Sequence, residues 1–157
     1  MGEDRILMIF HKTHQQVLDG TKTQTRRPRK LFQETSGGID PIHRIDEVYQ
    51  IREAGDTWCR VRRIYEVDKT YAVQLGRGKK SLGRIKLLKI RLEHVQSISC
   101  KDIIAEGLRT NLRKIDATMD LLQQWEELWD SIYGRTGFAW KYNPQVWVLE
   151  FELVEKY

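Results

Sequence analysis

The sequence predicts an α+β fold: a small twisted sheet or barrel with flanking helices, formed by residues 1–157 as a single domain. Several segments have the aromatic and β-branched content of strands, few have helical periodicity, and no repeat of fixed period occurs. With 40% hydrophobic residues, the chain can fill a core. Because its longest apolar run has five residues, we expect no membrane span. We also expect a cytoplasmic protein, and we favour a monomer.

The N-terminal part predicts a strand, a short helix and a second extended segment. Residues 5–10 form an apolar run typical of a buried strand, and residues 14–18 form a short helix that ends before Gly20. Residues 21–27 contain three Thr and stop at Pro28, which favours a strand or an extended loop over a helix.

The middle of the chain predicts a loop and then several strands. Breaker residues are densest in residues 29–46, so we expect a mobile loop there that acts as a lid or contacts RNA rather than packing as an element. Aromatic and β-branched content, or apolar alternation, predicts the strands, which cover residues 48–52, 58–67, 85–95 and 146–153.

Two helices are predicted in the C-terminal half. Ser99 and Asp102 have the spacing of a capping box, so a short helix begins there, carries Glu106 at its end and stops at Gly107. The second helix spans residues 116–133. Its apolar residues recur at three- and four-residue spacing and are expected to anchor the core: Met119, Leu122, Trp125, Trp129 and Ile132.

The net charge of +5 is unevenly distributed along the chain. Residues 1–95 contain 20 Lys and Arg against 12 Asp and Glu, whereas residues 96–157 contain 7 against 10. This asymmetry favours a polyanionic partner, because Lys and Arg that neutralise phosphates release condensed counterions. A charged surface that is merely solvated is the alternative.

The densest cationic stretch is residues 22–30, with five positive charges and no acid. On a strand, consecutive Arg26 and Arg27 cannot both face solvent unless the strand lies at an edge or lines a groove. We therefore expect a basic groove. The basic residues predicted to contact nucleic acid are Lys12, Lys22, Arg26, Arg27, Arg29, Lys30, Arg52, Lys79 and Lys80.

The segment Gly20-x-Lys22-x-x-Thr25-x-Arg27 resembles the G-x-K-x-x-E-x-R signature of ASCH domains, a branch of the PUA-like superfamily. The resemblance implies a PUA-like β-barrel with flanking helices and a cleft between them that binds nucleic acid or a nucleoside. Other segments fit it as well: Lys12, residues 48–53, Asp102-x-x-Ala105-Glu106-Gly107 and Asn143-Pro144-x-Val146-Trp147.

Thr25 stands where the broader family has Glu. The same departure occurs in the ASCH-like acetylcytidine amidohydrolases, and this resemblance implies that Lys22, Thr25 and Glu106 form a catalytic set. On a continuous strand Lys22 and Thr25 would face opposite sides, so we expect a backbone irregularity at residues 23–24. A Lys can activate a Thr hydroxyl when burial or nearby cations lower the pKa of the Lys.

The remaining signals are weaker. Trp140 and Tyr142 lie in a predicted loop, where they either stack on a base or pack over the end of the barrel. Cys59 and Cys100 are expected to be reduced, and no cofactor or metal is predicted. The leading hypothesis is binding of RNA or a modified nucleoside. The alternatives are a hydrolase, acting as an amidohydrolase on acetylated cytidine or as a ribonuclease, and a protein-interaction module.

Overall fold

The computed structural model describes residues 7–10, 12–31, 33–36, 41–53 and 56–157. The strands are β1 (Leu7–Ile9), β2 (Gln24–Pro28), β3 (Gln33–Ser36), β4 (Arg44–Glu53), β5 (Asp56–Glu66), β6 (Thr70–Gln74), β7 (Gly83–His94) and β8 (Gln145–Lys156). The helices are α1 (His14–Leu18), α2 (Cys100–Ala105) and α3 (Lys114–Tyr133), and two 3-10 turns are η1 (Val95–Ser97) and η2 (Trp140–Tyr142).

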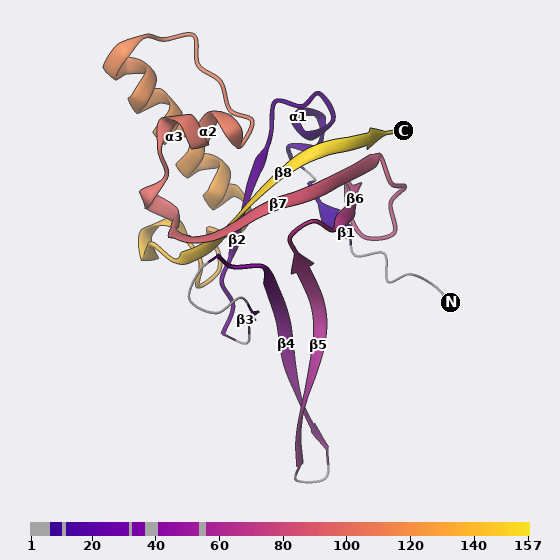
Figure 1. Ribbon diagram of the computed structural model, residues 1–157. Helices are drawn as coiled ribbons and strands as arrows, with labels where there is room; N and C mark the ends of the chain where they lie inside the picture. Colours follow the sequence, from indigo (N-terminus) through magenta and orange to yellow (C-terminus); the bar gives the residue numbers. More distant parts are fainter. Residues whose placement is uncertain (1–6, 11, 32, 37–40, 54–55) are drawn as a thin grey trace.

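The main sheet has the strand order β1-β6-β7-β8-β2. In the described part of this sheet, β1 and β6 pair in parallel and the other neighbouring strands pair antiparallel. β7 and β8 pair along most of their length, with register shifts between Arg84 and Ile85 and between Leu87 and Lys89. Such shifts bend a sheet, and Figure 1 shows it curled into a half-barrel with α2 and α3 on one side. The predicted α+β class is confirmed.

Alternation along β8 gives the sheet two buried faces. Trp147, Leu149 and Phe151 belong to a core inside the curl, whereas Val146 and Val148 belong to a second core beneath the helices. From α3 the second core receives Leu121, Trp125 and Trp129. Because β8 packs against α3 and also pairs with β2, it fixes the position of α3 relative to β2.

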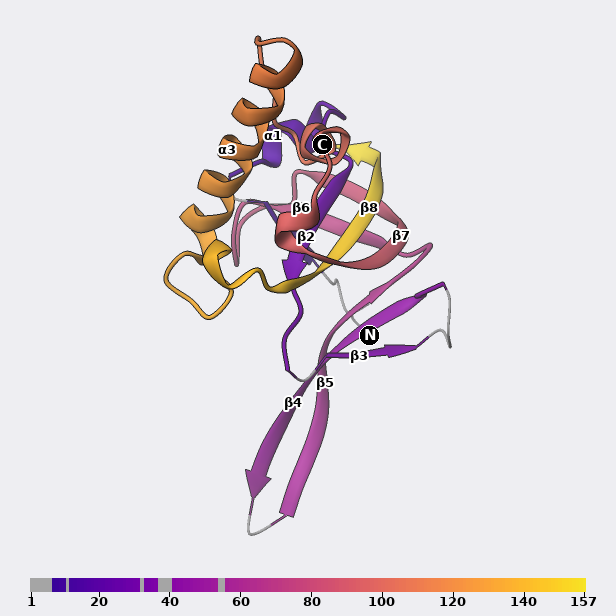
Figure 2. The same ribbon diagram turned by 90° about the vertical axis from the view of Figure 1, so that its left-hand side faces the viewer.

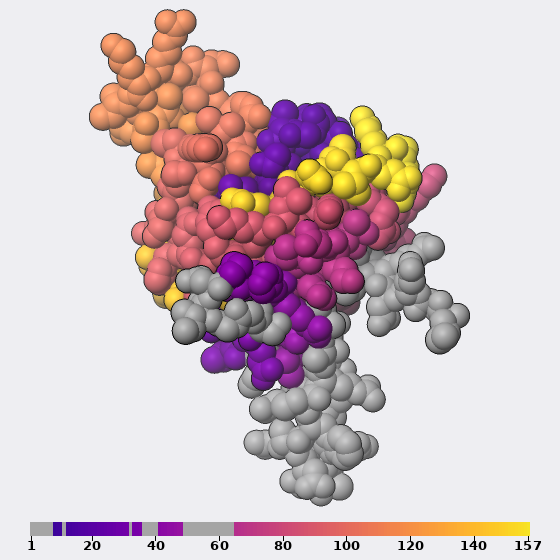
Figure 3. All heavy atoms as spheres, in the orientation of Figure 1, coloured from indigo at the N-terminus to yellow at the C-terminus, as the bar shows by residue number. Residues whose placement is uncertain are grey.

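The α3 helix buries a narrower stripe than its periodicity predicts. Trp125 and Trp129 are buried as expected, but Met119 is 64% exposed and Ile132 is 39% exposed. The expectation for these two residues is wrong. The first turns of α3, which carry Met119, extend beyond the body of the protein (Figure 3), and Ile132 lines the open pocket described below.

A second, antiparallel sheet has the order β3-β4-β5, and β4 and β5 form a hairpin that projects from the main sheet (Figure 2). The expected irregular loop is therefore wrong for residues 33–36, which form β3 and pair with β4, and for residues 44–46, which belong to β4. Backbone pairing with a long neighbour outweighs the polar composition of these residues. Residues 37–40, which carry most of the predicted breakers, lie outside the described residues.

None of the helices in the described part of the chain is long and apolar enough to cross a membrane.

Candidate functional site

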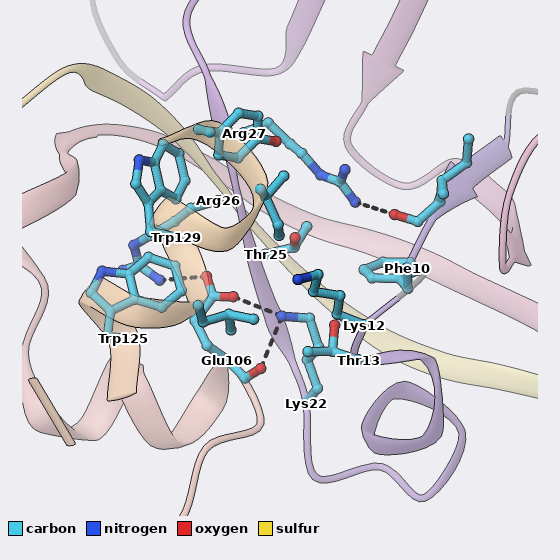
Figure 4. A pocket seen from close by; sticks show the side chains of 14 residues that line it. Phe10, Lys12, Thr13, Lys22, Thr25, Arg26, Arg27, Glu106, Trp125 and Trp129 are labelled. Carbon is cyan, nitrogen blue, oxygen red and sulfur yellow. Dashed lines mark hydrogen bonds and ion pairs between the residues drawn. The ribbon is translucent and has the colours of Figure 1, made fainter. Parts of the chain in front are cut away.

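A pocket lies where β2 faces the C-terminal half of α3 and the segment that joins β1 to α1 (Figure 4). Its cavity volume is about 60 Å³, and it opens to solvent. Its lining is charged on the β2 side and aromatic on the α3 side. The lining residues are Ile9, Phe10, Lys12, Thr13, Lys22, Thr25, Arg26, Arg27, Glu106, Trp125, Leu128, Trp129, Ile132 and Tyr133.

Lys22 and Glu106 form a buried ion pair at the base of this pocket. The Lys22 Nζ lies 2.7 Å from Glu106 Oε2 and also donates to the Glu106 main-chain oxygen at 2.9 Å. Burial lowers the pKa of Lys22 below its ordinary value of 10.5; Glu106 opposes this shift, and Arg27 and Arg26 add to it. The ammonium is therefore easier to deprotonate than that of a surface lysine.

Arg26 binds the other oxygen of the same carboxylate. Its Nη1 lies 2.9 Å from Glu106 Oε1, and its Nη2 lies 3.4 Å from Glu93 and 3.3 Å from Asp102. The Arg26 side chain has no exposed surface. Its positive charge is thus satisfied inside the protein by three carboxylates.

The start of β2 explains how Lys22 and Thr25 reach one pocket. Lys22 and Thr23 precede the strand, and their main-chain N–H groups donate to Gln16 at 2.9 Å and to Ala105 at 2.7 Å. Lys22 is therefore free of the strand alternation that would place it opposite Thr25. The irregularity expected at residues 23–24 is the boundary of the strand itself.

Thr25 is buried in the wall of the pocket. Its hydroxyl makes no hydrogen bond with any residue that the structure describes. Figure 4 shows Lys12 reaching over the pocket on the same side as Thr25 and Lys22. The structure thus brings Lys22, Thr25 and Glu106 to one pocket, with Lys12 at its rim.

Arg27 has a different environment from Arg26. Its Nη2 donates to the Ile9 main-chain oxygen at 2.8 Å, and its guanidinium lies 5.4 Å from the centre of the Phe10 ring. The side chain is half-buried, and none of the described carboxylates pairs with it. A guanidinium has five N–H donors, so Arg27 keeps donors for a ligand.

The aromatic wall of the pocket was not predicted as part of a site. Trp125, Trp129 and Tyr133 follow each other at four-residue spacing, with ring centres 5.8 and 4.4 Å apart. The sequence indicated core anchors for the two Trp residues, and they are buried. The repeated spacing of three aromatics was the available signal for a continuous ring surface, but only the position of β2 shows that a pocket opens against it.

The other predicted nucleic-acid contacts whose side chains the structure describes do not line this pocket. Arg29 is exposed and lies over the Trp147 ring, and Lys30 pairs with Glu47 at 2.7 Å. Trp140 is half-buried against the second core, whereas Tyr142 is 60% exposed beside Lys141. Lys79 and Lys80 are exposed in the turn between β6 and β7. Arg52 lies on β4, and its side chain is outside the described part of the structure.

No family model matches the chain, and no curated protein matches it. A solved structure of protein EF3133 from Enterococcus faecalis V583, titled with the family model DUF984, is similar over 94% of this chain and 72% of its own, with 12% identity and a TM-score of 0.54. This likeness shows the fold alone.

A solved ASCH domain from Lactobacillus crispatus JV V101 is similar over 90% of this chain and 70% of its own, with 11% identity and a TM-score of 0.46. It is a domain of the family that the sequence resembles. Neither likeness tests the motif residues.

Proposed function

We propose that the pocket binds a nucleobase, carried by a modified nucleoside or exposed in RNA. The observation that carries this proposal is that aromatic residues near the end of α3, Trp129 and Tyr133, line the same pocket as hydrogen-bonding side chains on β2. Proteins recognise unstacked bases by stacking on aromatic rings and by hydrogen bonds to the base edge. A base against the aromatic wall would direct its polar edge toward the Thr25 hydroxyl.

The charges of the pocket indicate a modest electrostatic contribution to this binding. Lys22 and Arg26 are paired with buried carboxylates, so they hold no free charge for a phosphate. Lys12 and Arg27 are the lining cations without a described carboxylate partner. We therefore expect binding of a nucleotide to weaken with salt by about two charge equivalents at most.

The proposal is tested by calorimetric titration of the protein with cytidine, N4-acetylcytidine, uridine, adenosine and guanosine. At least one nucleoside should bind. Arg27→Ala should weaken the binding of the 5′-monophosphate of this nucleoside about tenfold, because the variant removes a guanidinium contact. The matched control is Lys79→Ala, a cation outside the pocket, which should leave affinity unchanged. Equal losses in both variants, or no binding of any nucleoside, would contradict the proposal.

A second candidate function is hydrolysis of an N-acyl group on a nucleoside. It is supported by a specific observation: one pocket holds a Thr hydroxyl without an internal partner, a Lys with a lowered pKa and a Glu that contacts this Lys. These are the parts that nucleophilic catalysis by Thr requires.

The proposed steps use only these three side chains and the substrate. Lys22 first passes a proton to Glu106, and the neutral amine then accepts the Thr25 proton while Oγ attacks the acyl carbon. The carbon–nitrogen bond breaks as Glu106 protonates the departing amine, leaving an acyl ester on Thr25. A water molecule, with its proton taken by the carboxylate of Glu106, hydrolyses this ester, and Lys22 returns its proton to Thr25 as the acid leaves. Glu106 then passes its proton to Lys22, which restores the starting ion pair.

Acetate release from N4-acetylcytidine tests this second function. Thr25→Ala should abolish turnover, while Thr25→Ser should retain part of it because the hydroxyl remains. Thr25→Ala is expected to keep nucleoside binding, so the same titration shows whether the fold and pocket survive. Turnover that persists in Thr25→Ala would exclude Thr25 as the nucleophile and leave the binding function in place.

A further inference from the structure

A second hollow adjoins the pocket at the C-terminal end of α3. Its cavity volume is about 260 Å³, and it also opens to solvent. Two residues, Arg27 and Tyr133, line both spaces and so form the wall between them. The complete lining of the second hollow is Arg27, Pro28, Lys30, Gln33, Glu47, Tyr65, Tyr133, Thr136 and Phe138.

The second hollow repeats the chemistry of the first: rings on its walls and polar side chains beside them. Tyr65, Tyr133 and Phe138 supply the rings. Gln33 and Glu47 supply amide and carboxylate groups, and Glu47 is held by Lys30 at 2.7 Å. The Gln33 Oε1 already accepts from the Lys30 main-chain N–H and from Trp147 Nε1. A flat heterocycle with acceptors on its edge fits such a lining better than an aliphatic chain does, because it can accept from the Gln33 amide group.

Arg27 stands at the junction of the two hollows with unused donors. Its Nη2 is bound to the Ile9 oxygen, while its buried Nε has no partner among the described residues. A cation between two ring-binding spaces is placed to meet an anion that links two rings. In a nucleic acid that anion is the phosphodiester, and guanidinium groups bind phosphate oxygens strongly.

We propose that the ligand is a dinucleotide step of single-stranded nucleic acid, with one base in the first pocket, the next base in the second hollow and the linking phosphate on Arg27. This inference rests on the proposed nucleobase binding and names its substrate class. It also explains why Tyr133 continues the row of Trp125 and Trp129 as far as the second hollow.

The test compares three probes on the wild-type protein: the nucleoside that binds best, its 3′- and 5′-monophosphates, and dinucleotides that extend it by one nucleotide. A dinucleotide should bind about tenfold more tightly than the corresponding monophosphate, because a second base stacks. Thr136→Trp, which places an indole in the second hollow, should remove this gain and leave monophosphate affinity unchanged. Phe138→Ala should reduce the gain by removing a ring.

Thr118→Trp is the matched control, because Thr118 is exposed on α3 and lines neither hollow; it should keep the full gain. Nucleoside binding without any gain for the dinucleotide would overturn this inference and leave the proposed function standing. A gain that survives both Thr136→Trp and Phe138→Ala would place the second base elsewhere and also overturn it. Failure of every probe to bind would reject the proposed function itself.

Discussion

Arg26 and Arg27 are neighbours in the sequence with opposite electrostatic situations. Arg26 contacts the carboxylates of Glu106, Asp102 and Glu93, and its side chain is fully buried. Arg27 contacts a main-chain oxygen and a ring, and it lines two hollows. A buried ion pair that loses one partner leaves an uncompensated charge, whereas a half-buried cation without a carboxylate partner does not.

Removing each arginine in turn should therefore separate stability from binding. Arg26→Ala should lower the free energy of unfolding by about 3 to 5 kcal/mol, because its three carboxylates lose a common partner. Arg27→Ala should lower the free energy of unfolding by only about 1 kcal/mol. It should instead reduce the slope of nucleotide affinity against salt concentration by about one charge equivalent. Urea unfolding and binding at several salt concentrations measure the two effects. A reversed order of the two unfolding energies would contradict the ion-pair network.

The sequence could predict the cations of this site but not their pairing. Alternation along residues 22–30 indicated that some of them face a groove, and the structure places Lys22, Arg26 and Arg27 around one pocket. Their partners lie on other elements, as the link from Arg26 to Glu106, 80 positions away, illustrates. Local periodicity carries no information on such distant contacts, so the neutralisation of Lys22 and Arg26 could not be foreseen.

The pKa of Lys22 predicts a pH dependence of stability. Burial lowers this pKa below 10.5, so between the folded value and 10.5 the unfolded chain binds more protons than the folded one. The contribution of Lys22 to the free energy of unfolding should rise with pH through that window. The measurement is urea unfolding of wild type and Lys22→Met from pH 7 upward, with the difference taken at each pH. A difference that falls as pH rises would contradict the assigned direction.

At the scale of elements, the end of α2 holds the site together. Gly107 follows Glu106 with φ +101°, and a Cβ there would lie 3.0 Å from Gln16 Cβ and 3.3 Å from Lys22 Cβ. The main-chain oxygen of Glu106 also accepts a hydrogen bond from the Lys22 ammonium. Glycine thus allows α1, the Lys22 segment and α2 to approach one another closely.

Gly107→Ala should consequently perturb both stability and the pocket. It should cost about 3 kcal/mol of unfolding free energy from backbone strain and overpacking, and it should weaken nucleoside binding because Lys22 must move. Gly78→Ala is the control: it also has positive φ, +71°, but meets open space, so it should cost about 1 kcal/mol and leave binding intact. Equal costs in the two variants would show that crowding at Gly107 is not important.

Elements were predictable where the signal is local. Ser99 accepts from the Asp102 main-chain N–H at 3.1 Å, which confirms the predicted cap and start of α2. β3 and β6 were not predicted, because strands of four and five residues depend on pairing with β4 and β7 rather than on their own pattern. The aromatic row on α3 was assigned to the core for a related reason: periodicity shows which residues share a face, not what lies opposite it.

At the scale of the whole molecule, the pocket depends on one face of the curled sheet and on the helix that covers it. Val146 and Val148 on β8 hold Trp125 and Trp129, and β8 also pairs with β2, which carries Thr25 and Arg27. Among the side chains that the structure describes, none from the β3-β4-β5 sheet lines the first pocket. Binding of a single nucleoside should therefore rigidify the segments around the pocket and leave the β3-β4-β5 sheet unchanged.

Hydrogen exchange with and without a saturating nucleoside tests this expectation. Amide protection should increase in residues 12–26, in α2 near Glu106 and in the C-terminal half of α3, since these segments surround the pocket and a ligand raises the cost of opening them. Exchange in β4 and β5 should not change. The Thr25→Ala protein, if it still binds, should give the same map. Protection confined to the β4–β5 hairpin or to the basic turn at residues 75–82 would move the binding site away from the pocket and contradict the proposed function.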